Sequence, residues 1–187
     1  MSYFLKCLLF IFLITECNLL YSQKLDNTIN QNINSFKLLS LEKDTVFFSF
    51  KKNYTIFCAF SVYCSSCINE LNMMEQNLKK WDSLYSINII GFVNASDNSD
   101  FQKIVRFSKK HIYTFPLYID IKGELVTFLM SLENVKKDGN FRIFGSLYEC
   151  MRPQLFVFDK SGNLIFQKRG FVNGDELIIQ DVFIKNR

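Results

Sequence analysis

The sequence predicts an α/β fold of three layers, with helices on both faces of a mixed central sheet. Continuous apolar runs, which are typical of buried strands, alternate with segments whose apolar residues recur every three or four positions, as in helices. This alternation predicts parallel strands joined by helices. Near the carboxyl end, two apolar runs flank the polar turn 160–163, and this pattern predicts an antiparallel hairpin.

The elements around the centre of the domain are the clearest. Tyr54–Phe60 is a continuous apolar run, as expected of a central strand that is covered on both faces, and Ile87–Val93 predicts a second buried strand. Between them, Ser65–Trp81 is expected to be a helix because its apolar residues are spaced by three and four. Those residues are Ile68, Leu71, Met74, Leu78 and Trp81.

The other elements complete the order. Glu124–Leu132 is compatible with a helix, and the polar segment Asn134–Asn140 indicates an insertion loop. The remaining strands are expected at Phe36–Leu41, Thr45–Phe50, Pro116–Asp120, Pro153–Asp159 and Leu164–Lys168, and the remaining helices at Asp100–Lys110 and Gly174–Lys185.

The amino terminus has the pattern of a secretory signal peptide. A positive charge at Lys6 precedes the apolar run Cys7–Ile14, which is shorter than the roughly 20 residues of a membrane span. We expect cleavage after Ser22, a polar lead-in over residues 23–35, one domain over residues 36–187, and export to the periplasm or the outer face of the cell envelope. The alternatives are an uncleaved membrane anchor and a lipoprotein modified at Cys17, which the preceding glutamate disfavours.

Composition limits the partners. Removing residues 1–22 from the 187-residue chain leaves 165 residues and takes away one lysine and one glutamate, so the net charge stays +4. The basic residues are scattered rather than gathered in a patch, and we expect no nucleic-acid binding. A monomer is expected.

Four cysteines remain after such cleavage: Cys58, Cys64, Cys67 and Cys150. Export permits disulfides, and four cysteines allow three complete pairings between which the sequence does not choose. A domain of this size does not need disulfides in order to fold. The Cys64-Ser-Ser-Cys67 motif therefore indicates redox chemistry rather than a structural crosslink.

The position of this motif favours a reactive thiol. It lies where the expected strand 54–60 gives way to the expected helix 65–81. Unpaired backbone N–H groups and the positive end of the helix dipole favour a thiolate there, and the thiolate is the nucleophile of disulfide exchange. Cys64 is expected to attack a partner, and Cys67, one turn further along, is expected to resolve the mixed disulfide.

Two other uses of cysteine are disfavoured. A structural zinc site with this spacing normally needs a second ligand pair, and the chain has no second such motif and a single histidine, His111. A Cys–His hydrolase would need that histidine beside Cys64, and nothing in the sequence places it there. We expect His111 to be a solvated residue at a helix end, and we expect no metal and no bound cofactor.

Two segments resemble the thioredoxin-like superfamily. Phe57–Leu71 resembles its active-site segment, most closely that of the exported TlpA/ResA-like group, with Tyr63 at the position of the usual tryptophan and Glu70 at that of the group's acidic residue. Arg152–Ile165 is similar to the cis-proline segment with its Asp-x-x-Gly hairpin. Phe115–Gly123 is similar to a segment shared with peroxiredoxins.

The resemblance implies a thioredoxin-like three-layer α/β/α sandwich with a mixed central sheet. The additional expected strands before residue 54 would form an N-terminal extension. The 29 residues between Gly123 and Pro153 would contain an insertion before the cis-proline strand.

The resemblance also implies roles for three further residues. Glu70 would relay protons to Cys67; the alternative is an exposed acid near a helix start. Pro153 would follow a cis peptide bond, although an ordinary proline that begins a strand is the alternative. Arg152, just before it, would favour the thiolate of Cys64, unless its side chain turns to solvent.

The two isolated cysteines receive different interpretations. Cys58 lies six residues before Cys64, where the family often has a buried acid, and we expect it to be a small buried hydrophobic residue. Cys150 lies three residues before Pro153. It is expected near the redox pair but dispensable for turnover.

These features predict a thiol–disulfide oxidoreductase that acts on exported protein thiols or disulfides. The resemblance implies the reductive direction, with a membrane or periplasmic electron donor. One alternative is a peroxiredoxin-like thiol peroxidase, although no proline precedes Cys64 in the segment 60–63. The other is a thioredoxin-fold binding module without activity, which the intact cysteine pair disfavours.

Overall fold

The computed structural model describes residues 36–187, except residues 51, 95–97 and 135–152. The expected signal peptide, the polar lead-in and most of the expected insertion loop lie outside the described residues. The strands are β1 (Phe36–Leu39), β2 (Thr45–Phe48), β3 (Tyr54–Ala59), β4 (Ile87–Asn94), β5 (Leu117–Asp120), β6 (Gln154–Phe158) and β7 (Leu164–Arg169). The helices are α2 (Ser65–Tyr85), α3 (Asn98–Lys110), α4 (Glu124–Asn134) and α5 (Asp175–Lys185).

The described strands form one mixed sheet, as predicted. Its order is β2-β1-β5-β4-β3-β6-β7. The strands β3, β4 and β5 are parallel, whereas β6 and β7 follow beside β3 as the predicted antiparallel hairpin. The amino-terminal extension β1–β2 is an antiparallel pair that joins the sheet at β5.

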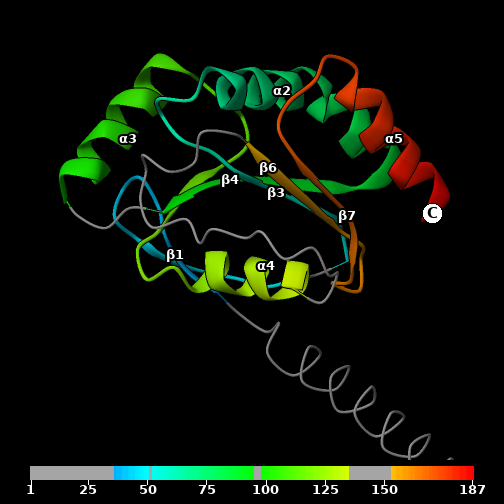
Figure 1. The fold of residues 1–187 in the computed structure, drawn as a ribbon, viewed down its shortest axis with the longest axis horizontal. Helices are drawn as coiled ribbons and strands as arrows, with labels where there is room; N and C mark the ends of the chain where they lie inside the picture. The colour runs from blue at the N-terminus through cyan, green and yellow to red at the C-terminus, as the bar shows by residue number, and fades with distance from the viewer. Residues whose placement is uncertain (1–35, 51, 95–97, 135–152) are drawn as a thin grey trace, which may run out of the picture. The chain divides into compact units, whose positions relative to one another are not determined.

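Helices cover both faces of this sheet, which confirms the three-layer architecture. Helices α2, α3 and α5 lie on one face, and α4 lies on the other (Figure 1). Each face has its own hydrophobic cluster, and the side chains of β3 alternate between them because successive residues of a strand point to opposite sides. Ile56 and Cys58 belong to the cluster on the α2 side, whereas Phe57 belongs to the cluster on the α4 side.

The strand β3 lies inside the sheet and directly precedes the site. Its backbone pairs with β4 on one side and β6 on the other, so that Cys58 is opposite Gly91 and Leu155. A side chain at Gly91 would meet the Leu117 side chain at 2.5 Å from its Cβ, so glycine permits the packing there. The residues that follow β3 are thereby fixed over the carboxyl end of the parallel strands.

The helix that follows β3 is longer than its apolar spacing predicts. We expected an end at Trp81, whereas α2 continues to Tyr85 and ends at Ser86 in the left-handed conformation. The last turn is stabilised from outside the helix, because Trp81 and Tyr85 both pack against Phe183 of α5.

Among the described residues, no helix is long and apolar enough to span a membrane.

Candidate functional site

The two cysteines of the motif form a disulfide at the start of α2. Cys64 is the N-cap of this helix, and Cys67 lies in its first turn, with 5.2 Å between the two Cα atoms. The pairing that the sequence left open is therefore Cys64 with Cys67. Cys58 is a buried thiol outside this disulfide.

The surroundings of the Cys64 sulfur favour negative charge. The backbone N–H of Cys67 donates to Cys64 Sγ over 3.2 Å, and Ser66 Oγ lies 3.2 Å from the same sulfur. The first turn of α2 contains no acidic residue that would oppose a thiolate. An N-cap sulfur that receives a helix N–H in the disulfide is placed to receive it as a thiolate after reduction.

The two sulfurs differ in access to solvent. Cys64 is 7% exposed, whereas Cys67 is 0% exposed. Tyr63, which precedes Cys64 in the chain, is 59% exposed. The turn before the helix is held by the Cys64 N–H, which donates to the Ser61 carbonyl over 3.1 Å. A partner can therefore reach Cys64 more readily than Cys67.

Glu70 is buried one helical turn after Cys67. It is only 2% exposed, so the alternative of a solvent-exposed acid is wrong. Residues three apart lie on the same helical face, which places this carboxyl on the side of α2 that holds Cys67. Burial is the main cause that raises the pKa of Glu70 to about 7 from an ordinary 4.5.

Cys58 contacts this carboxyl directly. Its thiol donates a hydrogen bond to Glu70 Oε2 over 3.0 Å, and its side chain is fully buried. The expected burial of Cys58 is confirmed, but its contact with Glu70 was not predicted. The available signal was the alternation of β3, which turns Cys58 toward the helix that contains Glu70.

A charged pair lies further along the same side of the domain. Lys168 of β7 forms an ion pair with Asp175, which begins α5 and is 2% exposed. The Asp175 side chain also accepts a hydrogen bond from the Val172 N–H over 2.9 Å. Asp175 raises the pKa of Glu70 and Lys168 lowers it, although both effects are smaller than that of burial. Neither residue belongs to a motif that predicted this pair.

The segment at Pro153 is placed only in part. Pro153 is buried and directly precedes β6, where Gln154 pairs with Ala59 at the end of β3. Its carbonyl accepts a hydrogen bond from the Gly170 N–H over 2.8 Å. Arg152 and Cys150 lie outside the described residues, and so does the bond that joins Arg152 to Pro153. The cis bond and the role of Arg152 stay predictions.

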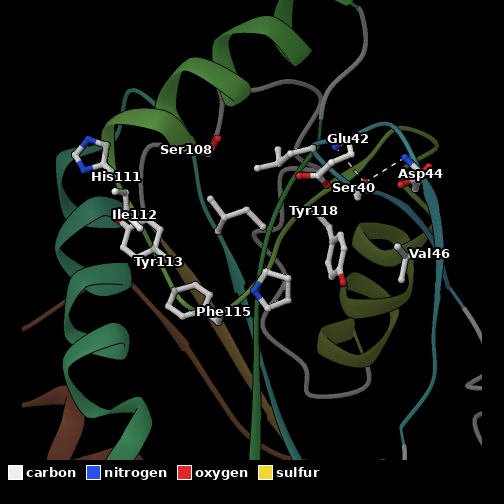
Figure 2. Close-up of a pocket in the computed structure, with 13 residues that line it drawn as sticks. Ser40, Glu42, Asp44, Val46, Ser108, His111, Ile112, Tyr113, Phe115 and Tyr118 are labelled. Atoms are coloured by element: carbon white, nitrogen blue, oxygen red, sulfur yellow. Dashed lines mark hydrogen bonds between the residues drawn. The ribbon is translucent and has the colours of Figure 1, made fainter.

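A separate pocket of about 480 Å³ lies between the β1–β2 turn and the segment 108–118 (Figure 2). Its lining includes Glu42, Asp44 and Tyr118, and it contains none of the redox cysteines, Glu70 or Pro153. His111 also lines it, just after α3, where its ring contacts that of Phe107 in a tilted arrangement with 4.7 Å between centroids. His111 is therefore not brought to Cys64.

Comparisons with known proteins agree with this geometry. Three solved structures share the fold. A thiol:disulfide interchange protein of the thioredoxin family from Chlorobium tepidum TLS is 21% identical, with a TM-score of 0.58, and the match covers 80% of this chain and 94% of that one. StoA from Bacillus subtilis is 20% identical, with a TM-score of 0.56 and coverage of 78% and 94%. The exposed lipoprotein thioredoxin from Streptococcus pneumoniae strain TIGR4 is 19% identical, with a TM-score of 0.53 and coverage of 79% and 97%.

Sequence comparison identifies the family. No curated protein sequence matches the chain. A family model does match, over residues 29–167, and it includes both redox cysteines, Glu70 and Pro153. The thioredoxin-like fold expected from the sequence is confirmed, and the disulfide at the start of α2 agrees with a thiol–disulfide oxidoreductase. This chain is a member of the AhpC/TSA family with a thioredoxin-like fold.

Proposed function

We propose that this protein reduces disulfides of exported proteins by exchange with the Cys64–Cys67 pair. The observation that supports this most directly is the placement of the pair, with the slightly more exposed Cys64 at the N-cap of α2 and the fully buried Cys67 in its first turn. Disulfide exchange needs one thiolate that a partner can approach and a second thiol that can reach the first. The similarity to a thiol:disulfide interchange protein supports the same activity.

The reaction has two exchange steps. The Cys64 thiolate attacks one sulfur of the partner's disulfide, a mixed disulfide forms, and the partner's other sulfur leaves as a thiolate. The Cys67 thiol then gives its proton to Glu70 and attacks Cys64 Sγ. The partner sulfur that was bonded to Cys64 leaves with the electron pair of that bond and takes up a proton. The partner is then reduced, and the Cys64–Cys67 disulfide remains.

Glu70 suits the proton transfer in the second step. A general base works best when its pKa lies near the working pH, and burial raises the pKa of Glu70 to about 7. A carboxyl with an ordinary pKa of 4.5 would accept the proton of a thiol much less readily. We propose that Glu70 accepts this proton and that Pro153, at the start of β6, helps to align the partner chain.

The location and the electron source follow from the same proposal. The expected signal peptide and the similarity to an exposed lipoprotein thioredoxin support a site of action outside the cytoplasm. There the disulfide must be reduced again after each turnover, and we propose a membrane or periplasmic dithiol as the donor. The donor's oxidised form, a disulfide, would be attacked by the Cys64 thiolate of Cys67→Ser, and the mixed disulfide that remains would identify it.

Reduction of insulin in the presence of dithiothreitol tests the proposal. The native protein is expected to accelerate precipitation of the insulin B chain, and Cys64→Ser is expected to fall to the rate of dithiothreitol alone because the attacking sulfur is lost. Cys150→Ser serves as the cysteine control and is expected to retain activity. No acceleration by the folded native protein would contradict the proposal.

The reduction potential tests the direction. A value near about −270 mV would mark a reductant, whereas a value near about −120 mV would mark an oxidant. Equilibration of the Cys64–Cys67 pair with glutathione buffers of known ratio gives this value. A potential at the oxidising end would replace the reductive direction by thiol oxidation.

A thiol peroxidase is the second candidate, because the family match is to AhpC/TSA proteins. In that reaction Cys64 would be oxidised by peroxide to a sulfenic acid, which Cys67 would convert to the disulfide with loss of water. Stopped-flow measurement of peroxide consumption distinguishes the two activities. Rapid consumption, with a sulfenic acid trapped on Cys67→Ser, would favour the peroxidase.

A further inference from the structure

We infer that Cys58 is a positioning residue for Glu70, holding its carboxylate by a thiol hydrogen bond on the side of α2 that contains Cys67. This inference rests on the proposed function, in which Glu70 accepts the proton of Cys67. The direct observation is the 3.0 Å hydrogen bond from Cys58 Sγ to Glu70 Oε2. It gives Cys58 a role different from that of a small hydrophobic residue.

The backbone around Cys58 allows little movement. Cys58 lies in β3, between β4 and β6, and its side chain is fully buried. The donor therefore comes from an interior strand of the sheet, while the acceptor comes from the helix that follows it. A carboxylate held from this side cannot turn freely along the helix surface, because one of its oxygens is fixed over the strand.

Other charged or titratable groups among the described residues lie near this contact, but they do not touch the Glu70 carboxylate. Lys168 of β7 and Asp175 of α5 influence Glu70 through their charges, in opposite directions, and they are paired with each other. Tyr113 lies near Cys58, and burial raises the pKa of its hydroxyl to about 12, so it stays neutral in the physiological range. Cys58, by contrast, touches the carboxylate itself.

The hydrogen bond has a defined effect on protonation. Burial raises the pKa of Glu70, and the bond from Cys58 opposes this rise because it is made to the charged form. Without the donor, the carboxyl would keep its proton to a higher pH. Fewer molecules would then have an ionised Glu70 ready to accept the Cys67 proton at neutral pH.

The test compares two variants that differ by one hydroxyl, Cys58→Ala and Cys58→Ser, in the full chain. Carbon NMR of the oxidised protein follows the Glu70 carboxyl against pH, with its signal assigned by loss in Glu70→Gln. The oxidised state is chosen because the disulfide cysteines do not titrate. We expect Cys58→Ala to shift the Glu70 midpoint upward by about one pH unit, and Cys58→Ser to restore or lower it.

Kinetics supply the second readout. The rate of mixed-disulfide resolution is expected to rise with pH through the Glu70 midpoint and to move upward with it in Cys58→Ala. In a Glu70→Gln background, Cys58→Ala and Cys58→Ser are expected to have equal rates, because the acceptor is gone. Should Cys58→Ala fold poorly, Cys58→Val provides a second variant without a donor that fills the space.

The outcomes separate this inference from the proposed function. An unchanged Glu70 midpoint in Cys58→Ala and Cys58→Val would overturn the positioning role, and so would an equal shift in Cys58→Ser. A native protein that fails to reduce insulin would contradict the proposed function instead, even if the Glu70 midpoint still responded to Cys58.

Discussion

The two faces of the central sheet share the same strands but differ in what their side chains do. On the α2 side, Cys58, Glu70 and the redox pair lie within or beside the hydrophobic cluster. On the α4 side, phenylalanine rings contact one another. The ring centroids are 4.8 Å apart for Phe50 and Phe158 and 5.8 Å apart for Phe57 and Phe158. The redox site thus lies on one side of the sheet, and these paired phenylalanine rings lie on the other.

Neighbouring residues of β3 contribute to the two different faces of the sheet. Phe57 points into the aromatic cluster, and Cys58 points toward Glu70. A strand that is buried on both faces can support both functions because its side chains alternate. A change on the α4 side is therefore expected to alter folding while leaving the redox site unchanged, whereas a change on the α2 side can alter both.

The largest effect on stability is expected on the α4 side. Phe158→Ala removes a fully buried ring and should lower the free energy of unfolding by about 3–5 kcal/mol, which urea denaturation measures. Phe158→Leu, which keeps more of the volume, should cost less than about 1.5 kcal/mol. The reduction potential of the folded fraction should be the same in both variants. A shift in potential that follows the loss of stability would break the comparison.

The next effect is the pH dependence that Glu70 gives to folding. Its pKa is raised from 4.5 in the ordinary state to about 7 in the fold, so the folded protein binds this proton more tightly than the unfolded chain does. The stabilisation that the protonated Glu70 carboxyl contributes to the fold is therefore fully present below pH 4.5 and is lost as the pH rises through 7. The loss, measured as the difference between the native protein and Glu70→Gln, should reach about 3 kcal/mol.

Denaturation at several pH values supplies this measurement. Both proteins should be compared in the oxidised state, so that cysteine titration does not contribute. A stability difference that stays constant between pH 4.5 and 8 would show that Glu70 has an ordinary pKa and that the α2 side holds no perturbed acid.

The smallest expected effect comes from Arg152. We predict that Arg152→Thr raises the pH midpoint of Cys64 thiolate formation by less than about one unit. A cation near a thiolate favours the charged form, but solvent weakens this interaction where the cation is partly exposed. Thiolate absorbance against pH measures the midpoint, and thermal unfolding checks the fold. An unchanged midpoint in a folded variant would show that the arginine points away from the sulfur.

The sequence was sufficient for the architecture because its patterns are local. The apolar run of β3, the three-and-four spacing of α2 and the hairpin at residues 160–163 each depend on residues close together in the chain. The position of Cys64 at a strand-to-helix junction was likewise evident from the order of the elements. These patterns yielded the correct order of strands and helices, and the two cysteines predicted as the redox pair form a disulfide.

Contacts between distant segments were not accessible in the same way. The end of α2 at Tyr85 depends on Phe183, almost a hundred positions later, and the bond between Cys58 and Glu70 depends on how α2 lies over β3. The Lys168–Asp175 pair likewise needs β7 and α5 to meet. Spacing along the chain does not encode such distances, so the environment of Glu70 emerged only from the tertiary structure.

The complete enclosure of Cys67 has a consequence for how long a partner stays attached. In the proposed cycle, a partner bound through Cys64 is released when this enclosed cysteine attacks the Cys64 sulfur, so the rate of release depends on the burial of Cys67 as well as on the acidity of the partner's leaving thiol. Partners whose leaving thiols are of similar acidity would then share a similar residence time, even where their affinities for the surface differ. In the proposed cycle, selection among them would occur at the first encounter, beside the exposed ring of Tyr63, and would be finished before release begins.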